Sequence, residues 1–181
     1  MDKNKQQNPW TKISTEVVYK NAWIKVREDQ VIRPDGTEGI YGVVETRIAT
    51  AVAALTPQNT IYLVGQYRYP MEEYSWEIIQ GGTDPGEDSL GAAKRELREE
   101  AGLIANTWEQ LGGEVHLSNC HSDERGLIYT AKELSVTAAQ PDCTEVLEIR
   151  EVPLPKAVEM VENGEIKDAM SIIGILRAAG S

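Results

Sequence analysis

Residues 81–103 of the chain read GGTDPGEDSLGAAKRELREEAGL, a glycine pair followed by an acidic loop and a helix-forming stretch. Asp88 or Ser89 can cap the start of this helix, because a short polar side chain accepts a hydrogen bond from a free backbone N–H group. Gly102 suits the end of the helix, since glycine readily adopts the left-handed conformation found there. Apolar residues recur at helical spacing and predict a narrow buried stripe: Leu90, Ala93, Leu97 and Ala101.

Three carboxylates lie within one turn of this predicted helix. Glu96, Glu99 and Glu100 fall in an arc of about 100° at the rotation of a helix. Like charges so close destabilise a helix, and converging carboxylate oxygens are what a hard divalent cation prefers. Glu87 can add a fourth carboxylate, and Arg95 can pair with Glu87 or another carboxylate to hold it in place. The alternative interpretation is a solvated acidic face, which is the usual meaning of a glutamate pair on its own.

The spacing of the whole segment is more specific than its acidity. Gly81 is followed after five residues by Glu87, and after seven more by Arg95-Glu96. The segment fits the pattern G-x5-E-x7-R-E-U-x-E-E-x-G-U, where U is aliphatic, at every specified position. This chain therefore resembles the Nudix hydrolases, whose sequence box has this pattern.

The resemblance implies a hydrolase that depends on Mg²⁺ or Mn²⁺, with two or more ions bound, and that cleaves a nucleoside diphosphate linked to another group. The resemblance also implies that Glu99 is a catalytic residue. The metal ligands implied by the match are the backbone carbonyl of Gln80 with the side chains of Glu96, Glu99 and Glu100. The supporting residues implied by it are Gly81, Glu87 and Arg95.

The rest of the chain alternates strand-like stretches with two closing helices. A Pro34-Asp35-Gly36 turn between apolar runs predicts an antiparallel hairpin in the N-terminal region. Further strands are expected at 51–55, 61–65, 74–79 and near 108–115, 126–131 and 145–151, and helices at 155–161 and 167–178. The order predicts a mixed β-sheet with helices packed on it. The resemblance implies that this is an α/β (α+β) fold of the Nudix type, with a mixed β-sheet core sandwiched between helices. We expect a flexible tail at 1–12 and one domain over 13–181, and the resemblance implies that the strands of 13–48 are used in dimerisation.

Two stretches outside the box resemble one branch of the family, the ADP-ribose and nucleoside diphosphate sugar pyrophosphatases. They are Gln66-Tyr67-Arg68 and Ser75-Trp76-Glu77. The branch implies a homodimer and a nucleoside diphosphate sugar substrate such as ADP-ribose or GDP-mannose. Trp23 and Tyr41 match aromatic residues that stack on the nucleobase, and Arg68 would meet a phosphate or the terminal sugar. The alternatives are half-buried core aromatics for the first two and a surface ion pair for Arg68.

The branch also implies a catalytic base in a loop well after the box, since the box carboxylates are committed to metal. Glu145 is the first candidate and Glu124 the second, and a solvated carboxylate at a strand edge is the alternative for Glu145. Asn119 stands where members that prefer ADP-ribose carry a proline, which favours a broader range of diphosphate sugars. Two other functions stay open: hydrolysis of dinucleoside polyphosphates or nucleoside triphosphates, and non-catalytic sensing of a nucleotide sugar.

Composition excludes several other classes. The 181 residues have a formal net charge of -11, which disfavours nucleic-acid binding because like charges repel. Two cysteines do not make a disulfide scaffold, and they favour a reducing, cytoplasmic setting. No run of 18 apolar residues is present, so we expect no membrane partner.

Overall fold

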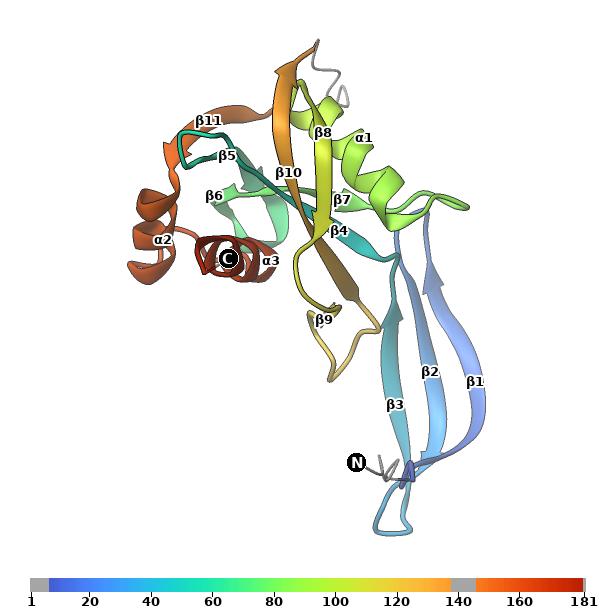
Figure 1. Cartoon of the computed structure of the whole chain (residues 1–181). Helices are drawn as coiled ribbons and strands as arrows, with labels where there is room; N and C mark the ends of the chain where they lie inside the picture. The colour runs from blue at the N-terminus through green and yellow to red at the C-terminus, as the bar shows by residue number, and fades with distance from the viewer. Residues whose placement is uncertain (1–6, 138–145, 181) are drawn as a thin grey trace. The chain divides into compact units, whose positions relative to one another are not determined.

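The computed structural model describes residues 7–137 and 146–180 (Figure 1). Its contacts group the chain into two compact units. The first consists of Met1–Arg47 together with Ser118–Glu124, and the second of Ile48–Leu117 together with Arg125–Ser181. Among the described residues, no helix is long and apolar enough to cross a membrane.

The N-terminal unit is built on a three-stranded antiparallel sheet in the order β1-β2-β3. Its strands are β1 (Thr11–Lys20), β2 (Lys25–Ile32) and β3 (Glu38–Glu45). Gly36 has a φ of 83° in the turn between β2 and β3, so the predicted hairpin turn is confirmed. Residues 7–10 have no regular secondary structure, and the sheet starts at Thr11, two residues before the expected boundary at residue 13.

The segment Ser118–Glu124 belongs to the N-terminal unit although it is distant in sequence. The Val44 backbone N–H donates to the His121 carbonyl at 2.8 Å, and the Asp123 N–H donates to the Val44 carbonyl at 3.1 Å. The Tyr41 hydroxyl adds a 2.6 Å bond to the Cys120 carbonyl. These bonds hold the segment along β3.

The second unit contains a mixed sheet and a smaller antiparallel sheet. The mixed sheet has the order β7-β4-β10-β8, with β9 on β10, and β4 and β10 run parallel. Its strands are β4 (Ala49–Ala54), β7 (Ile79–Gly82), β8 (Leu103–Gln110), β9 (Val115–His116) and β10 (Arg125–Val136). The second sheet has the order β11-β5-β6 and consists of β5 (Thr60–Arg68), β6 (Glu73–Glu77) and β11 (Glu148–Pro153).

Helices cover the mixed sheet on both faces, as predicted (Figure 1). They are α1 (Ser89–Ala101), α2 (Leu154–Glu162) and α3 (Ala169–Ala179), and the short 3-10 helix Tyr69–Met71 joins β5 to β6. Side chains of β4 alternate between two cores because successive residues of a strand point to opposite faces. Ala51 and Ala53 pack into the core of α2 and α3, whereas Val52 and Ala54 pack into the core of α1.

Candidate active site

The glycine pair and the acidic helix are brought together by local sequence signals. Gly81 lies in β7, which pairs antiparallel with β4, and α1 packs against both strands (Figure 1). Asp88 caps α1 by accepting a hydrogen bond from the Gly91 N–H at 2.7 Å. Gly102 ends the helix with a φ of 62°, as its sequence position predicts. The loop before α1 thus joins two fixed elements.

The three box glutamates lie on the side of α1 that is turned toward β7. Glu100 is 6% exposed, and its Oε2 accepts a hydrogen bond from the Gln80 backbone N–H at 3.2 Å. Glu96 is nearly buried and Glu99 is partly exposed. A buried carboxylate carries a large desolvation cost unless hydrogen bonds or opposite charges compensate it. This side of the helix therefore concentrates negative charge against the strand that carries the glycine pair.

Arg95 is the counter-charge within this group. Its Nε and Nη2 donate to the Glu87 carboxylate at 3.2 and 3.1 Å, and its Nη1 donates to Glu96 at 2.6 Å and to Glu99 at 3.1 Å. The hydrogen bonds with Glu87 are the largest cause of a raised pKa of Arg95. The Arg95 guanidinium and the Asp84 backbone N–H in turn hold the pKa of Glu87 below its usual range. Arg95 therefore stays charged and fixes the loop to the helix.

The residues present fit a divalent cation. A methyl group placed on the Gly81 Cα would overlap the Glu96 carboxylate, so only glycine leaves this space open. Three carboxylates and nearby backbone carbonyls are the all-oxygen donor set that Mg²⁺ or Mn²⁺ prefers. Within the described part of the chain, no three acidic, histidine or cysteine side chains are gathered closely enough to hold a metal ion, and Arg95 bonds both Glu96 and Glu99.

The comparisons with known proteins agree with this geometry. A family model described as the nucleoside diphosphate sugar hydrolase N-terminal domain matches residues 10–44, and the NUDIX domain model matches residues 45–170. The chain belongs to the Nudix family. The carboxylates of α1 and the glycine of β7 are thus those of its Nudix box, residues 81–103.

Individual relatives cover nearly the whole chain. A methanol dehydrogenase activator of Bacillus methanolicus is 33% identical over 90% of this chain and 89% of its own length. An ADP-ribose pyrophosphatase of Mycobacterium tuberculosis (strain ATCC 25618 / H37Rv) is 34% identical over 91% of this chain and 80% of its own. A crystal structure of an ADP compounds hydrolase has a TM-score of 0.84 and 22% identity, covering 94% of this chain and 92% of that one, and it supports the fold alone.

Arg68 is linked to the Nudix box through an ion-pair partner rather than lying alone at the surface. Its guanidinium forms an ion pair with Glu77 through Nε at 2.9 Å and through Nη2. The side chain of Arg68 is 37% exposed, whereas that of Glu77 is 3% exposed. Burial on its own raises the pKa of Glu77, but the hydrogen bonds and charge of Arg68 outweigh burial and hold the pKa below its usual range.

Glu77 is a residue to which the sequence assigned no role. It accepts a hydrogen bond from the side chain of Gln80, whose backbone N–H donates to Glu100. A chain of contacts therefore runs from Arg68 through Glu77 and Gln80 to the box. The signal available in the sequence was a charged residue directly before the apolar Ile78 and Ile79, and the expected strand 74–79 is in the structure two strands, since β6 ends at Glu77 and β7 begins at Ile79.

The remaining predicted residues belong to the N-terminal unit or fall outside the described residues. Trp23 is 75% exposed after a turn in which its N–H and that of Ile24 donate to Asn21 Oδ1, both at 2.8 Å. Tyr41 and Glu124 belong to the same N-terminal unit as Trp23. The box belongs to the second unit. Glu145, the first candidate for the base, lies outside the described residues.

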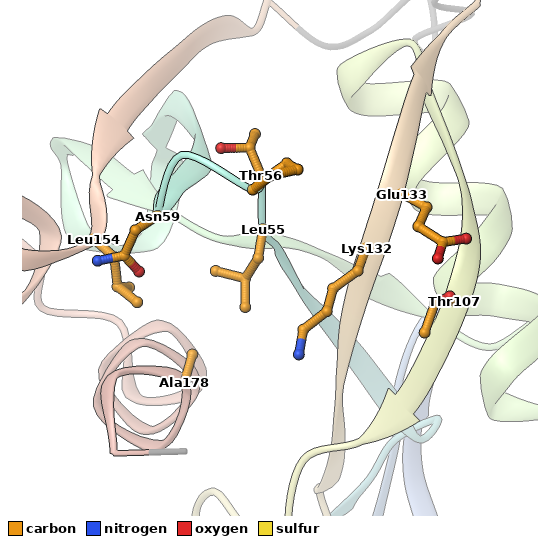
Figure 2. A pocket seen from close by; sticks show the side chains of 9 residues that line it. Leu55, Thr56, Asn59, Thr107, Lys132, Glu133, Leu154 and Ala178 are labelled. Atoms are coloured by element: carbon orange, nitrogen blue, oxygen red, sulfur yellow. The ribbon is translucent and has the colours of Figure 1, made fainter.

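A large hollow in the second unit contains no residue of the Nudix box (Figure 2). It has a volume of about 440 Å³ and is lined from the β4–β5 turn, β8, β10 and the helices, by residues that include Thr56, Asn59, Thr107, Lys132 and Leu154. The volume of a hollow therefore does not identify the candidate active site of this protein, whereas the arrangement of carboxylates does.

Proposed function

We propose that this Nudix protein hydrolyses the pyrophosphate bond of nucleoside diphosphate sugars, giving a nucleoside monophosphate and a sugar phosphate. The observation that carries the proposal is the group of Glu96, Glu99 and Glu100, with the Glu96 carboxylate packed directly against Gly81. The match of residues 10–44 to the N-terminal domain of nucleoside diphosphate sugar hydrolases supports this substrate class. A relative named ADP-ribose pyrophosphatase supports it further.

The box residues would hold divalent cations through the carboxylates of Glu96, Glu99 and Glu100 and the backbone carbonyl of Gln80. A bound Mg²⁺ or Mn²⁺ supplies charge neutralisation on a diphosphate and lowers the pKa of a water molecule, and two or more such ions are proposed. Arg95 keeps the box loop in place through Glu87, and the pair of Arg68 and Glu77 supports Gln80 from behind. These contacts would hold the residues beside the oxygen ligands in place before substrate arrives.

A further carboxylate is needed to accept the proton of the attacking water, because the box carboxylates would be occupied. Glu145 stays our first candidate for this base and Glu124 the second. The Glu124 N–H donates to Ser122 Oγ at 2.9 Å. This bond fixes the backbone of Glu124 and does not involve its carboxylate. Proton acceptance by a positioned carboxylate accelerates such reactions by about 10²–10⁴-fold.

Substrate contacts are proposed for Trp23, Tyr41 and Arg68. Both Nε and Nη2 of Arg68 donate to Glu77, which leaves Nη1 for an oxygen of the diphosphate or the sugar. The exposed ring of Trp23 offers a stacking surface for a nucleobase. Tyr41 presents a ring whose hydroxyl is already bonded to the Cys120 carbonyl, so stacking rather than hydrogen bonding would be its contribution.

A homodimer is proposed for the active form, and a cytoplasmic location stays a prediction from the cysteine content. Strand β1 supports the dimer because every residue of it is exposed and it forms an edge of its sheet. Four of these exposed side chains are large and apolar: Ile13, Val17, Val18 and Tyr19. Such an edge is a natural place for a second chain to bind.

Hydrolysis with Mg²⁺ across a panel of substrates tests the proposed activity. The panel is ADP-ribose, GDP-mannose, ADP-glucose, UDP-glucose, a dinucleoside tetraphosphate and a nucleoside triphosphate. We expect turnover of several diphosphate sugars and little of the last two. Turnover confined to the last two would overturn the substrate class, and thermal protection by a diphosphate sugar without turnover of any compound would favour a sensing role.

A further inference from the structure

The chain passes from the smaller antiparallel sheet to the mixed sheet at Ile78. β6 ends at Glu77, which pairs with Val64 of β5, and β7 begins at Ile79, which pairs with Val52 of β4. Ile78 lies between these two strands and is fully buried. A buried backbone N–H without an acceptor costs about as much free energy as a lost hydrogen bond. The N–H of Ile78 therefore needs an acceptor from another element.

That acceptor is Ser171, a fully buried residue in the first turn of α3. Its Oγ accepts a hydrogen bond from the Ile78 N–H at 3.0 Å. The Ser171 hydroxyl donates in turn to Asp168 Oδ2 at 2.7 Å, and the same oxygen accepts from the Ser171 backbone N–H at 2.7 Å. Asp168 is the N-cap of α3. The bonds that start the helix thus also orient the hydroxyl, so that a lone pair of Ser171 Oγ faces Ile78.

A second residue of α3 lets the helix approach Ile78 closely. Gly174 lies one turn after Ser171, and a methyl group on its Cα would lie 2.6 Å from Ile78 Cδ1. The side chain of Ile78 therefore packs against the bare backbone of the helix, while its N–H bonds to Ser171. α3 holds both the side chain and the backbone of this one residue.

The residues on either side of Ile78 belong to the candidate active site. Glu77 is the partner of Arg68 and accepts a hydrogen bond from the Gln80 side chain. Gln80 donates its N–H to Glu100, and its carbonyl is a proposed metal ligand. Only Ile79 separates Ile78 from Gln80, so a shift of the backbone at Ile78 would move the Gln80 carbonyl as well.

We propose that Ser171 is a positioning residue of the candidate active site. Its hydroxyl, oriented by Asp168, fixes the backbone at Ile78 and thereby places the Gln80 carbonyl relative to the carboxylates of α1. The inference rests on the proposed function, because this carbonyl is a metal ligand only if the box binds cations. A residue that merely supports the core would instead affect the Tm and leave metal binding as it is.

Amide hydrogen exchange of the full chain in EDTA, followed by NMR, tests the effect on the backbone. Ser171→Ala removes the acceptor, and we expect the Ile78 and Gln80 amides to exchange about tenfold faster relative to the amides of β4. Ile175→Val is the matched control, because it removes a methyl group from an equally buried residue of α3. It should lower the Tm without this selective change. Equal acceleration in both variants, or none in Ser171→Ala, would overturn the proposal.

Binding of Mn²⁺ without substrate and steady-state hydrolysis of GDP-mannose test the effect on the site. We expect Ser171→Ala to weaken Mn²⁺ binding and to lower kcat, each by about tenfold, with KM within about twofold, because a metal ligand rather than a substrate contact is displaced. Ile175→Val should leave the Mn²⁺ affinity and kcat at their wild-type values. Faster exchange in Ser171→Ala with wild-type Mn²⁺ affinity and kcat would reduce Ser171 to a structural role.

Asp168 provides a second pair of variants that leaves the serine in place. Asp168→Ala removes the oxygen that orients the hydroxyl and should reproduce the loss of Mn²⁺ affinity. Asp168→Asn keeps an oxygen that can accept both bonds and cap α3, so it should lose less than about threefold. Equal losses in these two variants would overturn the proposed orientation of the hydroxyl. A wild type that binds no Mn²⁺ would refute the proposed function together with this role, whereas Mn²⁺ binding without hydrolysis of any diphosphate sugar would refute the proposed function alone.

Discussion

The Cα of Gly81 on β7 faces the carboxylate of Glu96 on α1 so closely that no side chain fits between them. The same carboxylate accepts a hydrogen bond from Arg95 Nη1 at 2.6 Å, which fixes it from the helix side. The neighbouring Gly82 has open space around its Cα, although both glycines stand in the same strand. A side chain at Gly81 would therefore have to displace the Glu96 carboxylate, whereas one at Gly82 would meet nothing.

Gly81→Ala is expected to displace the Glu96 carboxylate and to lower kcat/KM by about 10–100-fold, the usual effect of misplacing a metal ligand. Gly82→Ala is the matched control, and we expect it to leave kcat/KM within about twofold because its methyl group meets nothing. Steady-state hydrolysis of ADP-ribose or GDP-mannose by the two variants measures the difference. Equal activity of both variants would contradict a functional close approach at Gly81.

Glu99→Gln and Glu100→Gln are each expected to lower Mg²⁺-dependent hydrolysis by about 100-fold or more, because each removes a negative charge from the proposed cation site. The Glu100 variant keeps an oxygen that can accept the bond from the Gln80 N–H, so circular dichroism should still show a folded protein. Glu159→Gln on α2 is the control for loss of a carboxylate on an exposed helix face. EDTA should abolish the wild-type activity, and unchanged metal-dependent turnover in both box variants would refute the proposed metal site.

The pair of Arg68 and Glu77 is expected to contribute to stability, since Glu77 is buried and depends on Arg68 for its charge. Arg68→Ala should cost about 2–3 kcal/mol at pH 7, somewhat less than a fully buried pair because Arg68 is partly exposed. The pKa of Glu77 is lowered in the folded protein, so this stabilisation is present above the ordinary glutamate pKa and disappears as the pH falls through the lower folded value. The Tm difference between wild type and variant should therefore shrink in acid.

Thermal unfolding in EDTA from pH 7 to pH 3 measures this difference. Lys156→Ala removes an exposed ion pair with Glu159 on α2 and should leave the Tm nearly unchanged. The double variant Arg68→Ala/Glu77→Gln should recover part of the loss, because it leaves no buried charge without a partner. Additive losses in the double variant would show that the two residues act independently.

Local signals in the sequence predicted the helix α1 correctly. Asp88 and Gly102 cap α1 at the expected positions, because capping depends on neighbouring residues. The hairpin turn at Gly36 is equally local. By contrast, a strand was expected near 108–115, whereas β8 begins at Leu103 directly after the helix. Pairing with β10 fixes this strand, and that contact is not visible in its own sequence.

Contacts between distant residues account for what the sequence could not predict. Glu100 belongs to the buried face of α1 only because β7 brings the Gln80 N–H to it. Glu77 finds Arg68 across the pairing of β5 with β6. The segment Ser118–Glu124 joins the N-terminal unit through bonds that His121 and Asp123 form with Val44, which is far earlier in the chain. Tertiary partners, rather than residue types, decide these roles.

The exposed edge strand β1 predicts a dimer that charge can disrupt. Val18→Lys places a cation on a strand whose ten residues are all exposed, and we expect it to shift a homodimer toward monomer. Val136→Lys, at an exposed apolar residue of β10, is the control for added surface charge. Sedimentation velocity over a range of protein concentrations measures the shift. A wild type that is monomeric at all concentrations would rule out the proposed dimer.

The candidate base can be separated from its neighbours by a matched pair of variants. Glu145→Gln is expected to lower kcat by about 10²–10⁴-fold with little change in KM, because it removes proton acceptance rather than binding. Glu148→Gln is the matched control. Glu148 lies three residues further on, at the start of β11, and accepts a hydrogen bond from the Tyr74 hydroxyl at 3.2 Å. Glutamine preserves that bond, so this control should keep kcat near the wild-type value. A full kcat in Glu145→Gln, together with a large loss in Glu124→Gln, would transfer the role of base to Glu124.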